Sequence, residues 1–586
     1  MIGLVGGLIA GLLRGGDAGL GLRGELSCAG KVDSNVQYTK PDHYAESTTA
    51  SADDCCHACN AAAPGCHAWK WSAQKGNQCR FLASAPTASQ RDDAYTSGTA
   101  APAAPTPPPA PTPPPAPGTC LAESYGAVAD GKTLNTAAIA AAIANASCST
   151  VAFDGPGVYL SGTIELRSHL ALRVGGGATL RGVDGHFAPS RPNVWDAYQD
   201  YGHSHWYDSF IVGDNVTGVA IEGTGTIDGG KGMKQRKPDK KGGGCRLIAL
   251  RSCADVTLAG FSTVNGGWFT LLATDVDGLH ISGTVVRAAR DGFDLVGCRN
   301  VLVEGVSISG GGDDAMVLKS DFSVGRVLPV YNVTVRDSAF SCGCNALNFG
   351  SETVGDFDGI LWENIVATGA GKAGIGIVTM DGANIRNVTY RNITLSNTVT
   401  PVHMYIGARQ RAPVRKVGSI SGIRLVDVVA THCAGGRGNW AATLDGQPAD
   451  PGANVSVIHP IGPDITLTNV DLSNCSQGGH PSSDAMIEPP HSAANYPPRY
   501  LGTRPAYGMF VRNAHGVAAA GLKLGWEASA RDDGRPAVVL ENATVALSAL
   551  VAQRSASAGI GYDVQLRAGT AGSSVTDSPG IIVKNQ

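Results

Sequence analysis

The chain is poor in charged and in aromatic residues. Charged residues make up 16% and aromatic residues 6% of its 586 residues. This composition does not suit a coiled coil or a disordered chain. The formal net charge of −4 is small for this length, so composition gives no electrostatic support for a nucleic-acid partner. No apolar run is long enough to cross a membrane, and we expect neither nucleic acid nor a membrane as a partner.

Glycine and cysteine, by contrast, are abundant. The 78 glycines suit an all-β architecture with many tight turns. Fifteen cysteines, several of them clustered, indicate an oxidising compartment, and the odd number leaves at least one thiol unpaired within the chain. Eight N-x-S/T sequons fit a secreted chain, although most of these asparagines are expected to serve packing. We therefore expect the protein to be extracellular (secreted) or in the cell wall.

The first 118 residues divide into three segments. Residues 1–24 contain an apolar stretch of the length of a signal peptide, without the basic residues that usually precede one. Residues 25–98 hold six cysteines, and so short a segment usually needs disulfides to fold. Residues 99–118 are rich in proline and predict an extended spacer.

The cysteine-rich segment contains DDCCHACNAAAPGCHAWKW followed by NQCRFL, which is similar to the PAN/apple module. The resemblance implies a small disulfide-stapled domain that binds carbohydrate or protein. Its cysteine and histidine spacing is not a clean zinc-ligand pattern, and we expect no metal and no cofactor.

Residues 119–586 form the main predicted domain. Near its start, LNTAAIAAAIANASC has the Ile and Ala spacing of a short amphipathic helix, and Cys120 and Cys148 flank it as plausible disulfide partners. A short strand pattern then recurs at irregular intervals, as in CADVTLAGF, CRNVLVEGV and IRNVTYRNI. Alternating apolar residues behind a polar or glycine lead indicate strands with one buried face, and intervals of roughly 20 to 45 residues indicate a solenoid. The pattern predicts an all-β fold, a right-handed parallel β-helix, in preference to a β-sandwich.

Three aspartates are expected to meet on this solenoid. The interval from Asp291 to Asp313 is close to one turn, so these residues should stack as neighbours with Asp314 beside them. The glycines at 310–312 permit a bulge or bend that turns both Asp313 and Asp314 outward. A group of carboxylates on a rigid face suits either calcium binding or glycoside hydrolysis.

YGAVADGKTLNTAAIAAAI, RDGFD and GGGDDAMVLKS, in this order, resemble the polygalacturonase-like glycoside hydrolases of family 28. The resemblance covers nearly everything after Cys120. It implies inverting hydrolysis of an α-linked sugar polymer such as pectin, with Asp313 as proton donor and Asp291 and Asp314 activating water. Asp294, Lys319, Asn345 and Arg409 are further candidates for contact with the substrate.

Several positions depart from the family pattern. The family's Asn-Thr before the first aspartate is Ala289-Arg290, its Gly-His-Gly aligns with Cys344-Asn345-Ala346, and its Arg-Ile-Lys aligns with Gly376-Ile377-Val378. In typical members the two lost cations bind the carboxylate of galacturonate. Substitutes considered from the sequence are the side chains of Arg290, Lys319, Arg409 and Arg411, the basic loop 231–244 and, for the histidine, His403.

Three functions remain open at this point. The first is a secreted, monomeric glycoside hydrolase with a polysaccharide substrate and a PAN-like module that holds carbohydrate or protein. The second is a polysaccharide lyase on the same fold. The third is a non-catalytic carbohydrate-binding or adhesion protein, favoured by the loss of the histidine, arginine and lysine.

Overall fold

The computed structural model describes residues 32–39, 43–48, 68–72, 78–82, 88–99, 118–433, 442–446, 460–478, 496–498, 504–531, 534–555 and 560–585. The chain divides into two compact units, residues 1–114 and 115–586. Within the described residues, no helix is both long and apolar enough to cross a membrane.

The N-terminal unit contains an antiparallel sheet of five strands in the order β1-β5-β3-β4-β2. These strands are β1 Val32–Thr39, β2 His43–Thr48, β3 Ala68–Ser72, β4 Gln78–Leu82 and β5 Ala88–Thr99. The leader, most of the clustered cysteines and nearly all of the proline-rich spacer lie outside the described residues. The PAN-like module therefore stays a prediction.

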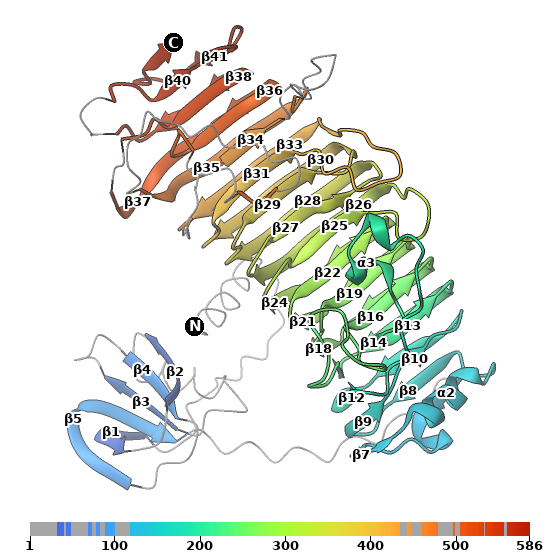
Figure 1. Cartoon of the computed structure of the whole chain (residues 1–586). Helices are drawn as coiled ribbons and strands as arrows, with labels where there is room; N and C mark the ends of the chain where they lie inside the picture. Colours follow the sequence, from blue (N-terminus) through green and yellow to red (C-terminus); the bar gives the residue numbers. More distant parts are fainter. Residues whose placement is uncertain are drawn as a thin grey trace, which may run out of the picture. The chain divides into compact units, whose positions relative to one another are not determined.

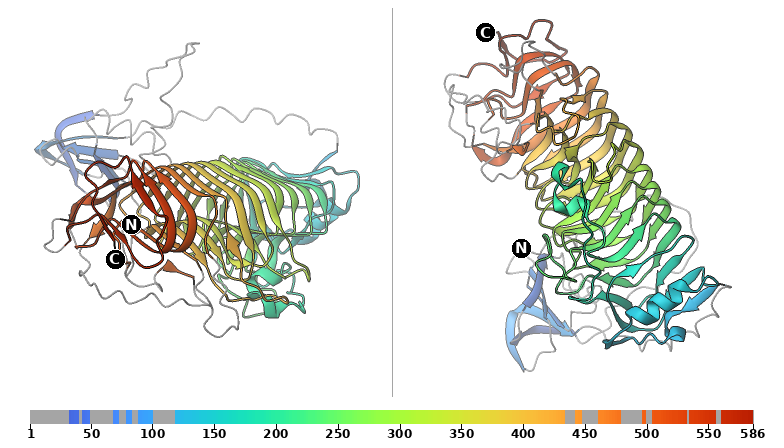
Figure 2. Two further views of the ribbon diagram at one scale, coloured as in Figure 1. Left: turned by 90° about the horizontal axis from the view of Figure 1, so that it is seen from above. Right: turned by 45° about the vertical axis from the view of Figure 1, so that its right-hand side comes forward.

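The second unit is a parallel β-helix, drawn in Figure 1 from the blue-green to the red end. Each complete turn contributes strands to three faces, and every strand pairs in parallel with the strand one turn away. The stacked turns are visible from two directions in Figure 2. Parallel pairing between successive turns confirms the β-helix and excludes the β-sandwich.

The first face contains the first strand of each turn. It consists of β10 Ile164–Glu165, β13 Ser209–Asp214, β16 Arg246–Arg251, β19 Phe269–Thr274, β22 Asp291–Val296, β25 Met316–Ser320, β27 Leu347–Thr353, β29 Ala373–Thr379, β31 Thr400–Ile406, β34 Ala442–Asp445, the starts of β36 Met509–Ala520 and β38 Val538–Ser548, β40 Val564–Leu566 and β42 Val583–Asn585.

The second face follows it along the chain. It consists of β6 Thr119–Leu121, β8 Thr150–Phe153, β11 Ala171–Val174, β14 Thr217–Gly223, β17 Ala254–Ala259, β20 Asp277–Ser282, β23 Arg299–Glu304, the first parts of β26 Val330–Cys342, β28 Phe357–Thr368, β30 Asn384–Ser396, β33 Ile423–Thr431 and β35 Ile465–Gly478, the ends of β36 and β38, the short β32 Ser419–Ile420, and β41 Ser574–Thr576.

The third face completes the turn. It consists of β7 Asp130–Leu134, β9 Gly157–Ser161, β12 Ala178–Gly182, β15 Thr226–Asp228, β18 Ser262–Val264, β21 Val285–Arg287, β24 Ser307–Gly311, the second parts of β26, β28, β30, β33 and β35, then β37 Lys523–Arg531 and β39 Val551–Ala552. Four short helices complete the described part of the unit: η2 Ala122–Tyr125, α2 Thr136–Ala144, η3 Asp196–Tyr198 and α3 Tyr201–Ser204.

Apolar residues stack in columns inside the β-helix because successive turns pair in register. One such column on the second face runs through Val219, Val256, Leu279, Val301, Val333, Ile360, Val388, Ile423 and Ile465. All of these side chains are buried. The repeat seen in the sequence is therefore one core position used once a turn.

The polar or glycine lead of each repeat also has a physical reason. At that position the backbone has a positive φ in turn after turn, a conformation that only glycine, asparagine and aspartate adopt readily. The residues are Gly218, Asp255, Gly278, Asn300, Asn332, Gly359, Asn387, Gly422, Asp464 and Gly516. Two of them, Asn332 and Asn387, belong to sequons and donate to Asn300 and Asp358 of the previous turn, at 2.8 Å and 3.3 Å. Their amides serve packing, as expected.

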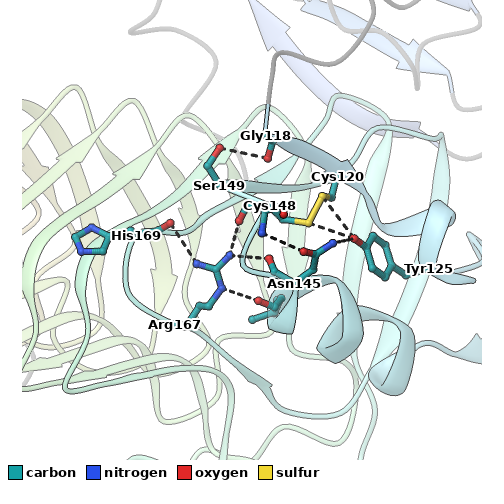
Figure 3. Close-up of a disulfide and its surroundings, with 10 residues drawn as sticks. Gly118, Cys120, Tyr125, Asn145, Cys148, Ser149, Arg167 and His169 are labelled. Carbon is teal, nitrogen blue, oxygen red and sulfur yellow. Dashed lines mark hydrogen bonds between the residues drawn. A yellow bond between two sulfur atoms is a disulfide. The ribbon is translucent and has the colours of Figure 1, made fainter.

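A disulfide fixes the N-terminal end of the β-helix, as Figure 3 shows. The predicted helix is α2, and Cys120 and Cys148 on either side of it form the predicted bond. Arg167 donates to the carbonyl oxygens of Ile143 and Asn145, at 2.6 Å and 3.1 Å, and so ties the end of α2 to the first turns.

Removing this disulfide should loosen the end cap. The Cys120→Ser/Cys148→Ser double variant frees a loop of 28 residues in the unfolded chain, and we expect the free energy of unfolding to fall by about 2–4 kcal/mol. Guanidinium denaturation followed by circular dichroism measures this change. An unchanged unfolding midpoint would show that α2 is held without the bond.

Candidate active site

Four successive turns carry polar residues at the point where the chain enters the first face. Main-chain hydrogen bonds join these entry points: Asp313 donates to Arg290 at 3.1 Å, and Lys372 donates to Cys344 at 2.9 Å. Strand register then defines two columns of residues. The outer column is Arg290, Asp313, Cys344 and Lys372, and the inner column is Asp291, Asp314, Asn345 and Ala373.

This register corrects one sequence-based expectation. Asp291 was expected to stack on Asp313, one turn later. Phe293 instead pairs with Met316, so the turn is slightly longer than the interval from Asp291 to Asp313, and Asp291 is level with Asp314. The neighbour of Asp313 in the preceding turn is Arg290.

The expected bend before the aspartates is present. Gly310 has a φ of +82°, and residues 312–315 lie outside the strands β24 and β25. The register between β24 and β26 shifts between Ile308 and Gly311, as a bulge produces. Ligand atoms of Asp313, Asp314 and Cys344 lie within 4.8 Å of one another, so both carboxylates reach the same side of the chain.

Asp313 is the carboxylate that solvent reaches. Its side chain is 25% exposed and lies between two cations of the outer column. Arg290 bonds both to Asp313 and, at 3.0 Å, to Asp291, so one guanidinium links the two columns. Lys372 Nζ lies 3.8 Å from the other carboxylate oxygen of Asp313. Each carboxylate oxygen of Asp313 thus has one cation against it.

The two inner carboxyls are buried behind it. Burial raises the pKa of Asp291 well above its usual range, and the nearby charge of Asp294 adds to the effect. Burial also raises the pKa of Asp314, with a contribution from the charge of Asp313. The Asp314 carboxylate accepts hydrogen bonds from the main-chain and side-chain nitrogens of Asn345, at 3.0 Å and 2.7 Å, and from Asn348 at 3.2 Å. The cluster therefore retains a proton at a pH at which a lone aspartate is ionised, and it titrates as a unit.

A second, deeper layer of charge supports the cluster. The side chain of Asp294 is fully buried and accepts a hydrogen bond from Lys319, whose Nζ also lies 3.0 Å from His203 Nε2. Burial alone would raise the pKa of Asp294, but Lys319 and His203 outweigh it and lower that pKa. Glu352 lies 3.8 Å from Lys319 and 3.7 Å from Arg409. Burial would likewise raise the pKa of Glu352, but His203, Lys319 and two arginines hold it well below its usual range.

A model of the family described as glycosyl hydrolases family 28 matches residues 156–459, just over half of the chain. The chain belongs to glycosyl hydrolases family 28. It is 28% identical over 272 residues to an endo-polygalacturonase of Pectobacterium carotovorum, a match that covers 42% of this chain and 64% of that enzyme. It is also 26% identical over 367 residues to a probable polygalacturonase of Vitis vinifera, covering 57% of this chain and 72% of that protein. A solved family 28 exopolygalacturonase of Yersinia enterocolitica has 17% identity and a TM-score of 0.46, with 84% of this chain and 78% of that chain covered.

Gly376, which the sequence aligns with an arginine of the family pattern, faces Asn348 of the previous turn. A Cβ at Gly376 would lie too close to Asn348 Oδ1, so the amide would have to shift. Asn348 donates to Asp314 and, at 3.0 Å, to the carbonyl of Gly350. A side chain at 376 would therefore disturb the contact between Asn348 and Asp314.

The family histidine aligns with Asn345, and His403 is the substitute that the sequence offers for it. The main-chain and side-chain nitrogens of Asn345 both donate hydrogen bonds to Asp314. His403 is in register with Gly376, is buried, and lies 2.9 Å from the carbonyl of Tyr496. Burial, together with the charge of Arg504, lowers the pKa of His403 to about 3. A neutral His403 does not supply the missing positive charge.

The cations expected from the sequence are mostly engaged with carboxylates. Lys319 is buried with Asp294, and Arg409 bonds to Asp381 at 2.9 Å and to the Ser351 hydroxyl at 3.0 Å. Arg411 is 30% exposed and pairs with Asp200 at 3.0 Å. In the basic loop 231–244, Lys240 pairs with Asp184 at 2.7 Å and Lys237 lies over the ring of Tyr201. The predicted substrate contacts of Asp294, Lys319, Asn345 and Arg409 stay predictions.

The sequence did not single out Lys372, which belongs to no recognised motif. Its side chain is 23% exposed, and its Nζ lies 3.2 Å from the hydroxyl of Tyr496, which comes from a segment far along the chain. His203 and Glu352 were also missed, because nothing near them in the sequence marks them as neighbours of Lys319. Asp313, Asp314 and Cys344 have the spacing of a metal site, but the adjacent Arg290 and Lys372 oppose a bound cation there.

The buried charge layer should make stability depend on pH. Glu352→Gln removes one buried carboxylate from Lys319 and Arg409, which keep Asp294 and Asp381 as their other partners. We expect the free energy of unfolding at pH 7 to fall by about 3 kcal/mol, the lower end of the range for breaking a buried ion pair. Because the pKa of Glu352 is lowered on folding, its contribution is complete above the unfolded pKa of about 4.3 and declines as pH falls below it. Urea denaturation of both proteins at several pH values measures the difference.

Glu304→Gln is the matched control, since Glu304 pairs with Arg336 at 2.6 Å on the exposed second face. It should have a much smaller effect at every pH. Equal losses in the two variants would contradict the stabilising role assigned to the buried layer.

Proposed function

We propose that the protein is a secreted hydrolase of α-linked acidic polysaccharides of the pectin type, acting with inversion. The observation that carries the proposal is the arrangement of one solvent-accessible carboxyl, Asp313, in front of two buried carboxyls that hold a proton. In this arrangement Asp313 protonates the leaving glycosidic oxygen, and Asp291 and Asp314 activate a water molecule.

The flanking cations constrain how this mechanism operates. Arg290 and Lys372 contact the two carboxylate oxygens of Asp313 in the free chain, and a general acid has to carry a proton when the bond breaks. The raised pKa values of Asp291 and Asp314 keep a proton within the cluster. A substrate carboxylate that engages Arg290 or Lys372 competes with their pairing to Asp313, so these two cations couple substrate binding to the acid.

The same cations favour an acidic polymer. Arg290 and Lys372 flank Asp313 along the outer column, which runs from turn to turn, so a chain lying along the β-helix meets positive charge on both sides of the acid. The two cations replace, in a different place, those that family members carry at positions 376 and 378. Both side chains are partly exposed and can exchange a protein carboxylate for one on the substrate.

Two disulfides, Cys120–Cys148 and Cys433–Cys475, agree with an extracellular site of action. The N-terminal unit is proposed to hold carbohydrate or protein next to a monomeric enzyme. The alternatives are a polysaccharide lyase and a non-catalytic binding protein. The activity measurements below distinguish them from a hydrolase.

Replacing the proposed acid tests the mechanism. Asp313→Asn should lower kcat on polygalacturonate by at least about 100-fold, because general acid catalysis contributes about 10²–10⁴. Activity on an aryl galacturonide with a good leaving group should fall much less, since that leaving group needs little protonation. Reducing-sugar release and aryl release measure the two rates, and proton NMR of the first product gives its anomeric form.

Asp291→Asn is the comparison, because loss of water activation should lower both rates alike. An equal fall in both rates for Asp313→Asn would reject it as the acid. If the wild-type protein binds both substrates but cleaves neither, the non-catalytic alternative is favoured. An unsaturated product that absorbs ultraviolet light would favour the lyase.

Lys372 should set the acidic limb of the pH profile. Its charge lowers the pKa of Asp314, so Lys372→Met should raise that pKa and move the rising limb of kcat/KM to higher pH. The profile on polygalacturonate measures this, and Lys372→Arg, which keeps the charge, is the control. A limb that stays in place in Lys372→Met would show that Asp314 does not titrate in the rising limb.

A further inference from the structure

A cavity lies beside the first face, away from the carboxylate cluster. It has a volume of about 510 Å³. Its walls come from the segment 191–207 and from the C-terminal ends of β13 and β16, with Ser323 and Val324 after β25. Ser204, which also lines the cavity, is the last residue of the helix α3 labelled in Figure 1.

One wall is organised by a single carboxylate. Asp214 accepts hydrogen bonds from the hydroxyl of Tyr207, at 2.9 Å, and from two nitrogens of Arg251, both at 2.6 Å. The guanidinium of Arg251 lies 5.0 Å from the ring of Trp206. Asp214 and Arg251 thus neutralise each other and fix the two aromatic rings in place.

Arg191 is the charged group left over. Its guanidinium carbon lies 3.3 Å from the centre of the Tyr207 ring, and its side chain is exposed. Within the described part of the chain, the Arg191 guanidinium makes no hydrogen bond or ion pair with a protein acceptor. A guanidinium held on an aromatic ring with free N–H groups is arranged to bind a carboxylate with two parallel hydrogen bonds.

An aromatic ring stands beside this charge. Trp195 lines the cavity and remains 37% exposed, although it is held edge-on by Phe322 at 5.2 Å. An exposed tryptophan of fixed orientation offers a flat apolar surface, on which the apolar face of a sugar ring can pack. Charge and ring together fit a sugar that carries a carboxylate.

The cavity and the carboxylate cluster lie at opposite ends of the strands of the first face. Arg246, at the start of β16, is in register with Asp291 through Phe269. Arg251, at the other end of β16, lies roughly 17 Å further along at about 3.3 Å per residue, and β16 and β22 are about 10 Å apart, so the two sites are about 20 Å apart. The segment 201–206 joins them, since His203 contacts Lys319 while Ser204 and His205 line the cavity.

We infer that this cavity is a secondary binding site for a uronic acid residue of an acidic polysaccharide, with Arg191 holding the carboxylate and Trp195 the ring. The choice of an acidic sugar chain rests on the proposed function. The site would hold a polymer chain at a distance of several sugar residues from the cluster. It should therefore strengthen binding of long chains and leave short ones unaffected.

Binding to the full-length Asp313→Asn chain tests the inference without turnover. The probes are polygalacturonate fragments long enough to reach from the cluster to the cavity, digalacturonate, and the fully methyl-esterified long fragments, each followed by tryptophan fluorescence and calorimetry. The protein is made in a host that does not glycosylate Asn215, which also lines the cavity. Arg191→Ala should weaken binding of the long acidic fragments by about tenfold or more, as expected for a lost charge-assisted contact.

The same variant should leave the methyl ester unaffected, and Trp195→Ala should weaken binding of both the acid and the ester. Arg386→Ala, which removes an exposed arginine from another face, is the matched control and should change nothing. In the active enzyme, Arg191→Ala should raise KM on polygalacturonate with kcat unchanged.

Each failure points to a different conclusion. Unchanged affinity of Arg191→Ala for the long acidic fragments overturns the inference, and so does an equal loss with the ester or with Arg386→Ala. If long fragments bind through Arg191 but no variant or substrate gives turnover, the secondary site stands and the proposed hydrolysis fails. If polygalacturonate is cleaved and Arg191→Ala has the wild-type KM, hydrolysis stands and the secondary site fails.

Discussion

Parallel pairing between successive turns is the constraint on which the rest of this molecule depends. Each turn has to return the chain to the same register, because every main-chain donor and acceptor of a strand bonds to the turns before and after it. Residues far apart in sequence then share a column at a spacing of about 4.8 Å. The apolar core column, the positive-φ column at Asn300 and Asn332, and the charged outer column at Asp313 all result from this one requirement.

Columns also explain how so much charge is kept in one place. A side chain has its neighbours one turn above and one turn below, so a carboxylate can have a cation on either side. Asp313 pairs with Arg290 of the preceding turn and lies 3.8 Å from Lys372, which comes from two turns further on, and Asp294 pairs with Lys319 of the following turn. These ion pairs lower the free-energy cost of burying charge. At Asp291 and Asp314 the nearby cations do not fully offset burial and negative charge, so the pKa values of both carboxyls are raised.

The sequence predicted what repeats and missed what does not. The core column and the positive-φ column recur every turn, so periodicity alone identifies the β-helix, and the helix α2 and the Cys120–Cys148 bond follow from local spacing. The sequence could not predict which aspartate of the next turn is in register with Asp291. The bulge at Gly310 decides whether this partner is Asp313 or Asp314. Lys372 and Tyr496 meet only through folding, and Arg191 and Trp195 come from a connection that carries no repeat.

Position 376 is part of how Asp314 is held. Asn348 donates to Asp314, and a Cβ at Gly376 would lie too close to Asn348 Oδ1. An arginine at 376 would therefore displace the amide and disturb its contact with Asp314. The cations that contact Asp313 come instead from the strand entries, where Arg290 and Lys372 lie. Asn345 and Asn348 both donate to Asp314, so the residues at 345, 348 and 376 act together on this carboxylate. A single substitution of Gly376 by arginine would disturb this packing around Asp314 before it supplied a cation.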